Sequence, residues 1–262
     1  MSYETLLIKT NDNILTIILN KPKSMNAFSL TMFNELNDAF NEINKREDIR
    51  VLIIKGAGRT FSAGGEMEML NTLNQLKGAK LEKTLTGIIS LASKFMKLRQ
   101  PTISSIHGYC LGVGCSIAML SDIRIASEDA VLGLEFVGMG IIPDTGALYS
   151  LPRIIGLSKA KELALTNRRV NSQEAEKIGM VNSVVPRDQL ETKVEKVACQ
   201  IASLPPIAIE MTKKLLNDSL RQNLDEILRY EALAQTICLN TEDHKEAVSA
   251  FLSKRKPFFT GK

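Results

Sequence analysis

Short apolar runs alternate with longer amphipathic stretches over the first 185 residues of the chain. Thr5–Thr10 and Ile14–Leu19 are rich in residues that favour strands, and Asn11-Asp12-Asn13 between them predicts a hairpin turn. The apolar run Val51–Lys55 is typical of a strand that is covered on both faces of a sheet. Further short strands are predicted at Ile123–Ala126, Val131–Leu134 and Val181–Val185.

Helical periodicity fills the stretches between these strands. Ser29 is a typical N-cap, and the apolar residues after it fall on one helical face. Thr84–Leu98 has the same stripe, and Pro101 prevents its continuation. Ser172 is expected to cap a short helix that Gly179 ends. Two more helices are predicted at Leu148–Ile155 and Lys159–Thr166.

The pattern changes after Pro186. Four stretches between residues 188 and 254 have helical periodicity, and no strand pattern follows them. We therefore divide the chain into an α/β region, residues 1–186, and a helical region, residues 187–262. A terminal helical region of this kind often packs on a neighbouring subunit.

The stretch Thr102–Met119 is the most informative part of the chain. A β-branched run opens it, Gly108 interrupts it, and Gly112 and Gly114 lead into the apolar segment Cys115–Leu120. This order predicts a strand, a glycine turn and a buried helix. Backbone N–H groups at a helix start lack intrahelical acceptors, and glycines let a ligand approach them closely. The turn can therefore present N–H donors to an anion or a developing oxyanion.

A second glycine-rich turn has the same plan. Val51–Lys55 runs into Gly56–Gly65, and two acids, Glu66 and Glu68, follow in the first turn of the next predicted helix. Ligands of open α/β sheets bind beyond the carboxyl ends of strands. Two amides from two such turns can converge on one oxygen, and losing one donor of an oxyanion hole typically costs about a hundred- to a thousandfold in rate.

Composition narrows the class of protein without fixing its chemistry. With 262 residues, 44% hydrophobic and 24% charged, the chain resembles an ordinary globular protein with a sizeable core. The net charge of +4 is spread along the chain and does not single out nucleic acid as a partner. Four cysteines without CxxC spacing and two histidines argue against a zinc site, so we expect no metal. No signal or membrane-spanning pattern is present, and we expect a cytoplasmic protein.

Four stretches of the sequence carry a resemblance to one family. Arg59–Leu70 (RTFSAGGEMEML) resembles its F-x-A-G-x-D/E segment, and Ile106–Ser127 resembles its G-x-x-x-G-x-G segment ending in S/C-D-x-R-x-A. Gly138–Gly156 and Phe251–Lys262 resemble its G-x-x-P-x-x-G-x-x-x-L-P-R-x-x-G stretch and its F-x-x-K-R-x-P-x-F ending. The whole chain thus resembles the crotonase (enoyl-CoA hydratase/isomerase) superfamily.

This resemblance implies a fold, a substrate and an assembly. The fold would be an α/β spiral of ββα units with a C-terminal helical trimerisation region, and the protein would form a homotrimer or a dimer of trimers. The substrate would be an acyl-CoA thioester, with coenzyme A present only as part of the substrate and no other cofactor. The thioester oxygen would lie between the N–H groups of Gly65 and Val113. Other residues implied to line the CoA and substrate path are Lys23, Ala27, Ser62, Ala63 and Ser116.

The family's members differ in the carboxylates that move protons. Hydratases resemble one another in two glutamates, and here Ser116 and Phe136 stand at the matching positions, with Glu135 one residue out of register. Asp144 matches the place where several isomerases of the family keep their acid. One carboxylate suffices to move a double bond, since it removes a proton from one carbon and returns it to another. We therefore favour enoyl-CoA isomerisation through an oxyanion-stabilised enolate.

Several alternatives stay open at this point. A hydratase would position water with Glu135 and Asp144, and a non-catalytic homologue would bind CoA or RNA without turnover. Asp144 is also a candidate helix cap, and Glu135 is expected to form a surface salt bridge rather than act as a second acid. Structural roles are expected for His107 in a packed turn, Cys110 and Cys115 as core thiols, and Asp122 with Arg124 as a structural pair.

Overall fold

Two sheets organise the strand-bearing part of the computed structural model, which describes residues 3–262. The larger sheet has the strand order β1-β2-β3-β4-β6-β9, with only the β1–β2 pair antiparallel. The smaller sheet has the order β5-β7-β8. The strands are β1 Leu6–Asn11, β2 Ile14–Leu19, β3 Val51–Gly56, β4 Thr102–Ile106, β5 Tyr109–Leu111, β6 Ile123–Ser127, β7 Val131–Gly133, β8 Val170–Asn171 and β9 Ser183–Val185.

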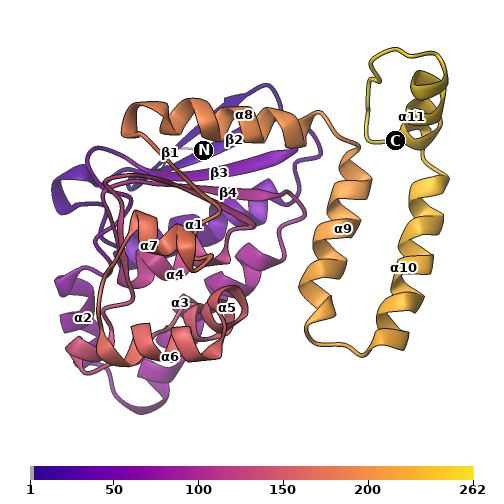
Figure 1. Cartoon of the computed structure of the whole chain (residues 1–262). Helices are drawn as coiled ribbons and strands as arrows, with labels where there is room; N and C mark the ends of the chain where they lie inside the picture. The colour runs from indigo at the N-terminus through magenta and orange to yellow at the C-terminus, as the bar shows by residue number, and fades with distance from the viewer. Residues whose placement is uncertain (1–2) are drawn as a thin grey trace.

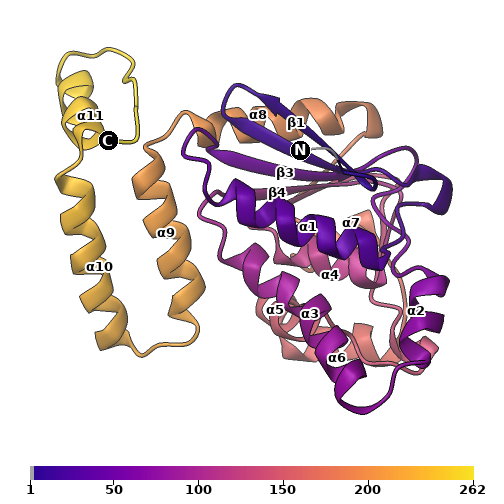
Figure 2. The ribbon, with the colours of Figure 1, turned by 180° about the vertical axis from the view of Figure 1, so that it is seen from behind.

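Helices cover both faces of the larger sheet (Figures 1 and 2). On one face, α8 packs its buried residues on an apolar layer from β3, β4 and β6. The other face carries the main core, to which α1, α3 and α4 contribute. The helices are α1 Leu30–Ile43, α2 Met67–Asn74, α3 Gly78–Met96, α4 Gly112–Leu120, α5 Ala147–Ile155, α6 Leu157–Thr166, α7 Ser172–Lys177, α8 Leu190–Ala202, α9 Pro206–Ser219, α10 Leu224–Leu239 and α11 Glu242–Leu252.

Local sequence signals account for most of these boundaries. The hydroxyl oxygen of Ser29 accepts a hydrogen bond from the Met32 amide at 3.1 Å, which confirms the predicted cap of α1. At α7 the predicted cap is wrong by one residue, because Asn171 accepts from the Glu174 amide. Ser172 is instead fully buried and donates to the Glu128 carbonyl at 2.8 Å.

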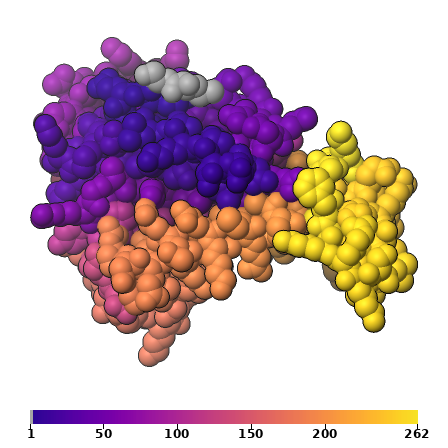
Figure 3. Space-filling view, turned by 90° about the horizontal axis from the view of Figure 1, so that it is seen from above, coloured from indigo at the N-terminus to yellow at the C-terminus, as the bar shows by residue number. Residues whose placement is uncertain are grey.

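The last three helices form an arm that projects from the rest of the molecule (Figures 1 and 3). We call residues 205–262 the arm and residues 3–204 the body. Helix α8 belongs to the body because it covers the sheet, so the chain leaves the body near Pro205 rather than at Pro186. The arm exposes many large apolar side chains, including Leu216, Leu220, Leu224, Leu228, Leu233, Ile237, Phe251 and Leu252.

Two basic side chains fasten the arm to the body. The Arg50 guanidinium donates to the carbonyls of Ala202, at 2.9 Å, and Phe259, at 2.6 Å. Lys213 on α9 reaches Asp122 at 2.7 Å and the Gln100 carbonyl at 2.8 Å. None of the helices described between residues 3 and 262 has the length and apolar character needed to span a bilayer.

Candidate active site

The two glycine-rich turns, far apart in sequence, lie side by side. Ser62 and Cys110 form an isolated parallel bridge. The Ser62 amide donates to the Tyr109 carbonyl at 2.9 Å, and the Leu111 amide donates back to the Ser62 carbonyl at 2.9 Å. This short ladder aligns the loop before α2 with the strand that leads into α4.

Glycines make this close approach possible. A Cβ on Gly112 would lie 3.4 Å from the Gly64 Cα, and one on Gly64 would lie 3.4 Å from the Leu111 carbonyl oxygen. Both residues also have positive φ, 104° at Gly64 and 50° at Gly112, a region that side chains disfavour. The backbones of the two turns therefore touch at these two glycines.

The amides of Gly65 and Val113 follow directly after this contact. Val113 is the second residue of α4, so its N–H has no acceptor within the helix. Gly65 bridges Phe28 through its neighbours, because Phe28 donates to Gly64 and Glu66 donates to Phe28. Within residues 3–262, neither the Gly65 nor the Val113 N–H has a hydrogen-bond acceptor. Both donors are thus without an acceptor among the described residues, and they lie at adjoining turns.

A third loop, residues 20–28, supports the first turn through Asn26. The fully buried Asn26 side chain accepts from the Lys21 amide at 3.0 Å and donates to the carbonyls of Ala57 and Thr60. Its backbone carbonyl accepts from the Ser62 hydroxyl at 2.8 Å. The sequence analysis missed this residue. Its one signal, the tolerance of asparagine for the positive φ of 54° seen here, is weak.

The other residues predicted to line the CoA path divide into buried and accessible ones. Ser62 and Ser116 are fully buried, and the Ser116 hydroxyl donates to the Gly112 carbonyl at 3.3 Å within α4. Ala27 is also buried, whereas Ala63 is half-buried and its amide donates to the Met25 carbonyl. Lys23 is exposed.

Lys23 borders a cavity of about 700 Å³ beside the first turn. Arg59, Tyr109 and Asp129 line the same cavity. Two cations and an aromatic ring next to one acid form a surface that suits a polyanionic group with an aromatic part.

Asp144 lies in the loop before α5 and is half-buried. Burial raises the pKa of its carboxyl group. The Thr145 hydroxyl donates to Oδ1 at 3.0 Å, and this hydrogen bond lowers the pKa and so offsets part of the rise. The Asp144 side chain does not cap α5, whose N-cap is Gly146. Gly146 packs against Leu120 of α4 and Ala92 of α3, so the loop is held at the helix that supplies the Val113 amide.

The positions that matched the hydratase glutamates carry no carboxylate. Phe136 is buried, and so is Ser116. Glu135 forms an ion pair with Arg169, and its other oxygen lies 3.3 Å from the arginine Nη2. The expected surface salt bridge of Glu135 is therefore present.

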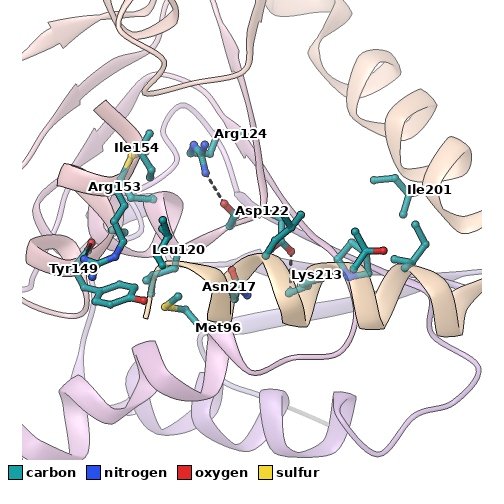
Figure 4. Close-up of a pocket in the computed structure, with 18 residues that line it drawn as sticks. Met96, Leu120, Asp122, Arg124, Tyr149, Arg153, Ile154, Ile201, Lys213 and Asn217 are labelled. Atoms are coloured by element: carbon teal, nitrogen blue, oxygen red, sulfur yellow. Dashed lines mark hydrogen bonds and ion pairs between the residues drawn. The ribbon is translucent and has the colours of Figure 1, made fainter. Parts of the chain in front are cut away.

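Figure 4 shows a second cavity, of about 440 Å³, between the body and α9. Met96, Leu120 and Tyr149 line it from the body and Lys213 from the arm, and none of the predicted acyl-CoA residues is among its described lining. The expected structural pair of Asp122 and Arg124 is not a direct ion pair, although the charge of Asp122 acts on the Arg124 guanidinium. Asp122 pairs with Lys213 and Thr102, while Arg124 donates to the carbonyls of Ser121 and Met180.

The remaining candidates for chemistry have structural surroundings. His107 is buried with Nε2 3.3 Å from the Gly58 carbonyl oxygen. Cys110 and Cys115 are both fully buried, as expected for core thiols, and burial raises the pKa of Cys110 well above its usual value. Among residues 3–262, no three His, Cys, Asp or Glu side chains gather in an arrangement suited to a metal ion.

Comparisons with known proteins cover nearly the whole chain. The sequence pattern of the family "Enoyl-CoA hydratase/isomerase" matches residues 9–262. The chain belongs to the enoyl-CoA hydratase/isomerase family. The crotonase-like α/β fold is likewise confirmed, since the structure of an enoyl-CoA hydratase from Bacillus anthracis superposes with a TM-score of 0.93 at 33% identity, covering 99% of this chain and 100% of the other.

The members of this enoyl-CoA hydratase/isomerase family that resemble the chain carry two kinds of name. A crotonyl-CoA hydratase of Syntrophomonas wolfei is 34% identical over 263 residues, covering both chains completely. A peroxisomal Delta(3,5)-Delta(2,4)-dienoyl-CoA isomerase of Arabidopsis thaliana is 33% identical over 271 residues, covering 98% of each. Other relatives of similar identity are named hydratases, so the names favour hydration over the predicted isomerisation.

Proposed function

We propose that the protein acts on acyl-CoA thioesters and shifts the double bond of an enoyl-CoA through an enolate. The observation that carries this proposal is the pair of unpartnered amides, Gly65 and Val113, at two touching turns. Two N–H donors aimed at one thioester oxygen stabilise the negative charge that develops when a neighbouring C–H loses its proton.

Asp144 is the proposed acid and base. It takes a proton from one carbon of the substrate, the electrons of that C–H bond pass into the thioester as an enolate, and the same carboxyl returns a proton to a different carbon. Burial supports this role, because a raised carboxyl pKa makes the group both a better base when ionised and able to hold the proton between the two steps.

Isomerisation needs one such group, whereas hydration needs an acid and a base on either side of a water molecule. Phe136 and Ser116 offer no carboxylate, and Glu135 is ion-paired with Arg169. These three residues favour isomerisation over hydration. Hydration, with Asp144 and Glu135 positioning water, is the second candidate because most of the relatives carry hydratase names.

The cavity beside Lys23 and Arg59 is the proposed place of the CoA nucleotide, whose phosphates complement the two cations. The proposed assembly is a homotrimer or a dimer of trimers formed through the arm, whose many exposed leucines are suited to contact with another subunit.

The deciding experiment compares wild type with Asp144→Asn and Glu135→Gln on 3-hexenoyl-CoA and 2-hexenoyl-CoA. Double-bond position and water addition are both followed. We expect isomerisation that falls about a hundred- to ten-thousandfold in Asp144→Asn, the usual range for losing a general acid–base, and that falls far less in Glu135→Gln, which removes no reacting group. Rapid hydration that survives Asp144→Asn would reject the isomerase assignment, and CoA binding without any turnover would reject an enzymatic role.

A further inference from the structure

Arg169, which the sequence analysis did not single out, contacts two segments of the candidate site at once. Its guanidinium pairs with Glu135, two residues after β7, and lies 5.4 Å from the centroid of the Tyr109 ring on β5. The second Glu135 oxygen lies 3.3 Å from Arg169 Nη2. An ion pair and a cation–π contact at such distances both stabilise a structure. Arg169 itself immediately precedes β8, so one side chain links residues that lie on or next to all three strands of the smaller sheet.

Each of these two partners begins a segment of chain that leads to one of the two proposed catalytic groups. Tyr109 begins the strand that ends at Leu111, and Val113 with its free amide follows in the first turn of α4. Glu135 begins the segment that continues through Phe136 and the 3-10 turn Val137–Met139 to Asp144. The relative placement of the oxyanion donor and the acid therefore depends on how this segment sits against β5.

The Glu135 backbone has a conformation that depends on the contacts around it. Its φ is 41°, in the left-handed region that side-chain-bearing residues disfavour. Such a conformation persists only when surrounding contacts impose it. A further contact of the same kind comes from Asn167, whose side-chain oxygen accepts from the Gly138 amide at 3.2 Å. Gly133 lies against the Arg169 and Glu135 side chains, because a Cβ added to it would lie 3.3 Å from Arg169 Cγ and 3.5 Å from Glu135 Cγ.

We propose that Arg169, through Glu135 and Tyr109, is a positioning residue that sets the Asp144 loop against the α4 turn for proton transfer. This inference rests on the proposed function, because it assigns Arg169 a role in the step that Asp144 performs. Arg169 touches no reacting atom in this account. It acts by fixing the geometry of two groups that do, and a misplacement of about 1 Å in such a pair can cost about a hundredfold in rate.

The test compares Arg169→Met, Glu135→Gln and the double variant with Arg168→Met as a matched control. Arg168 is the neighbouring residue and is as strongly ion-paired, but with Glu162 on α6 and Glu174 on α7. The readouts are kcat and KM for 3-hexenoyl-CoA at a temperature well below the unfolding transition, together with the thermal midpoint of each variant.

We expect kcat of Arg169→Met to fall about ten- to a hundredfold while KM changes little and the acid limb of the pH profile stays in place. The double variant should lose no more than the single one, because both changes break the same contact. Arg168→Met should lower the thermal midpoint and leave kcat unchanged. Arg169→Lys should restore only part of the rate, since an ammonium group cannot pair bidentately with Glu135 while lying on a ring.

Two results would overturn the inference. One is wild-type kcat in Arg169→Met with Asp144→Asn impaired, which leaves the proposed function standing and removes only the positioning role. The other is an equal loss of kcat in Arg168→Met, which would mark a general effect of destabilisation. Should Arg169→Met fail to fold, Glu135→Gln, which keeps the size of the side chain, decides in the same way. Undiminished isomerisation in Asp144→Asn would refute the proposed function itself.

Discussion

Asp144 is a carboxyl group whose ionisation the fold makes harder. Burial raises its pKa, and the hydrogen bond from Thr145 offsets part of that rise. A general base works only when ionised, so its activity appears as pH increases through the raised pKa. The acid limb of kcat/KM should therefore lie above the usual range of an aspartate, which is about 3.9.

Thr145→Val should move this acid limb to still higher pH. The substitution removes the hydroxyl that stabilises the ionised carboxylate, and burial then acts without that compensation. The measurement is kcat/KM for isomerisation between pH 4 and pH 9, with Thr145→Ser as the control that keeps a hydroxyl donor. A limb that stays in place in Thr145→Val would show that another group sets the profile.

The sequence predicted the two glycine turns, because a glycine turn before a helix is visible in one stretch of chain. Gly65 and Val113 within these turns were assigned through the resemblance to the family, and their role as oxyanion donors stays a prediction. Asn26 and Arg169 were missed because their partners lie far away in sequence: Asn26 binds carbonyls about 31 and 34 positions on, and Glu135 is 34 positions from Arg169. The ion pair of Asp122 with Lys213 was missed for the same reason, since Lys213 reaches it from the arm.

Helix α4 depends on how closely its first turn approaches the loop before α2. A Cβ on Gly114 would lie 2.5 Å from the Ser62 Cβ, which is fully buried and has no room to withdraw. This contact is shorter than real side chains allow, so an alanine at position 114 must push the two turns apart.

Gly114→Ala should destabilise the fold by about 1–3 kcal/mol, the usual cost of overpacking, and reduce turnover because the Gly65 and Val113 amides separate. Urea unfolding and kcat measure the two effects. Gly87→Ala is the control: Gly87 is an exposed position of α3 at which a Cβ would have nothing within 4 Å, and the change should stabilise by about 0.5–1 kcal/mol. A Gly114→Ala protein as stable and active as wild type would contradict the close packing of the turns.

The periodicity of apolar residues predicted which segments form helices better than it predicted where those helices begin and end. The helix predicted at Thr84–Leu98 begins six residues earlier, at Gly78. The sequence did not predict this start because the first turns of α3 are exposed and have no stripe of apolar residues. The helix predicted from Cys115 begins at Gly112, since two glycines lower the apparent helix propensity where tertiary contacts demand the helix.

For the whole molecule, the predicted α/β fold is confirmed, and the place where the arm leaves the body differs from the expected division. Pro186 ends the strand pattern, but α8 has an apolar face that the sheet needs. A change in secondary structure along the sequence does not reveal which element a helix packs on, so the sequence alone could not place this boundary.

The arm should hold the subunits together. Leu233 on α10 is 57% exposed, so Leu233→Glu should spare the fold of the body and lower the molar mass measured by light scattering. Glu231→Gln, an exposed polar change on the same helix, is the control and should keep the mass of the wild type. A Leu233→Glu protein with unchanged mass would exclude this face of α10 from the interface.

The guanidinium of Arg50 gives the arm a second point of attachment. It binds both Ala202, where α8 ends, and Phe259 in the tail, so the segment between these residues, which contains α9, α10 and α11, is held at both ends. Fixing both ends of a segment restricts the movement of the helices between them, because no helix can move without displacing the others. A change at Arg50 would therefore free the C-terminal tail from the body and leave the arm attached only through the linker at Pro205 and through Lys213 on α9.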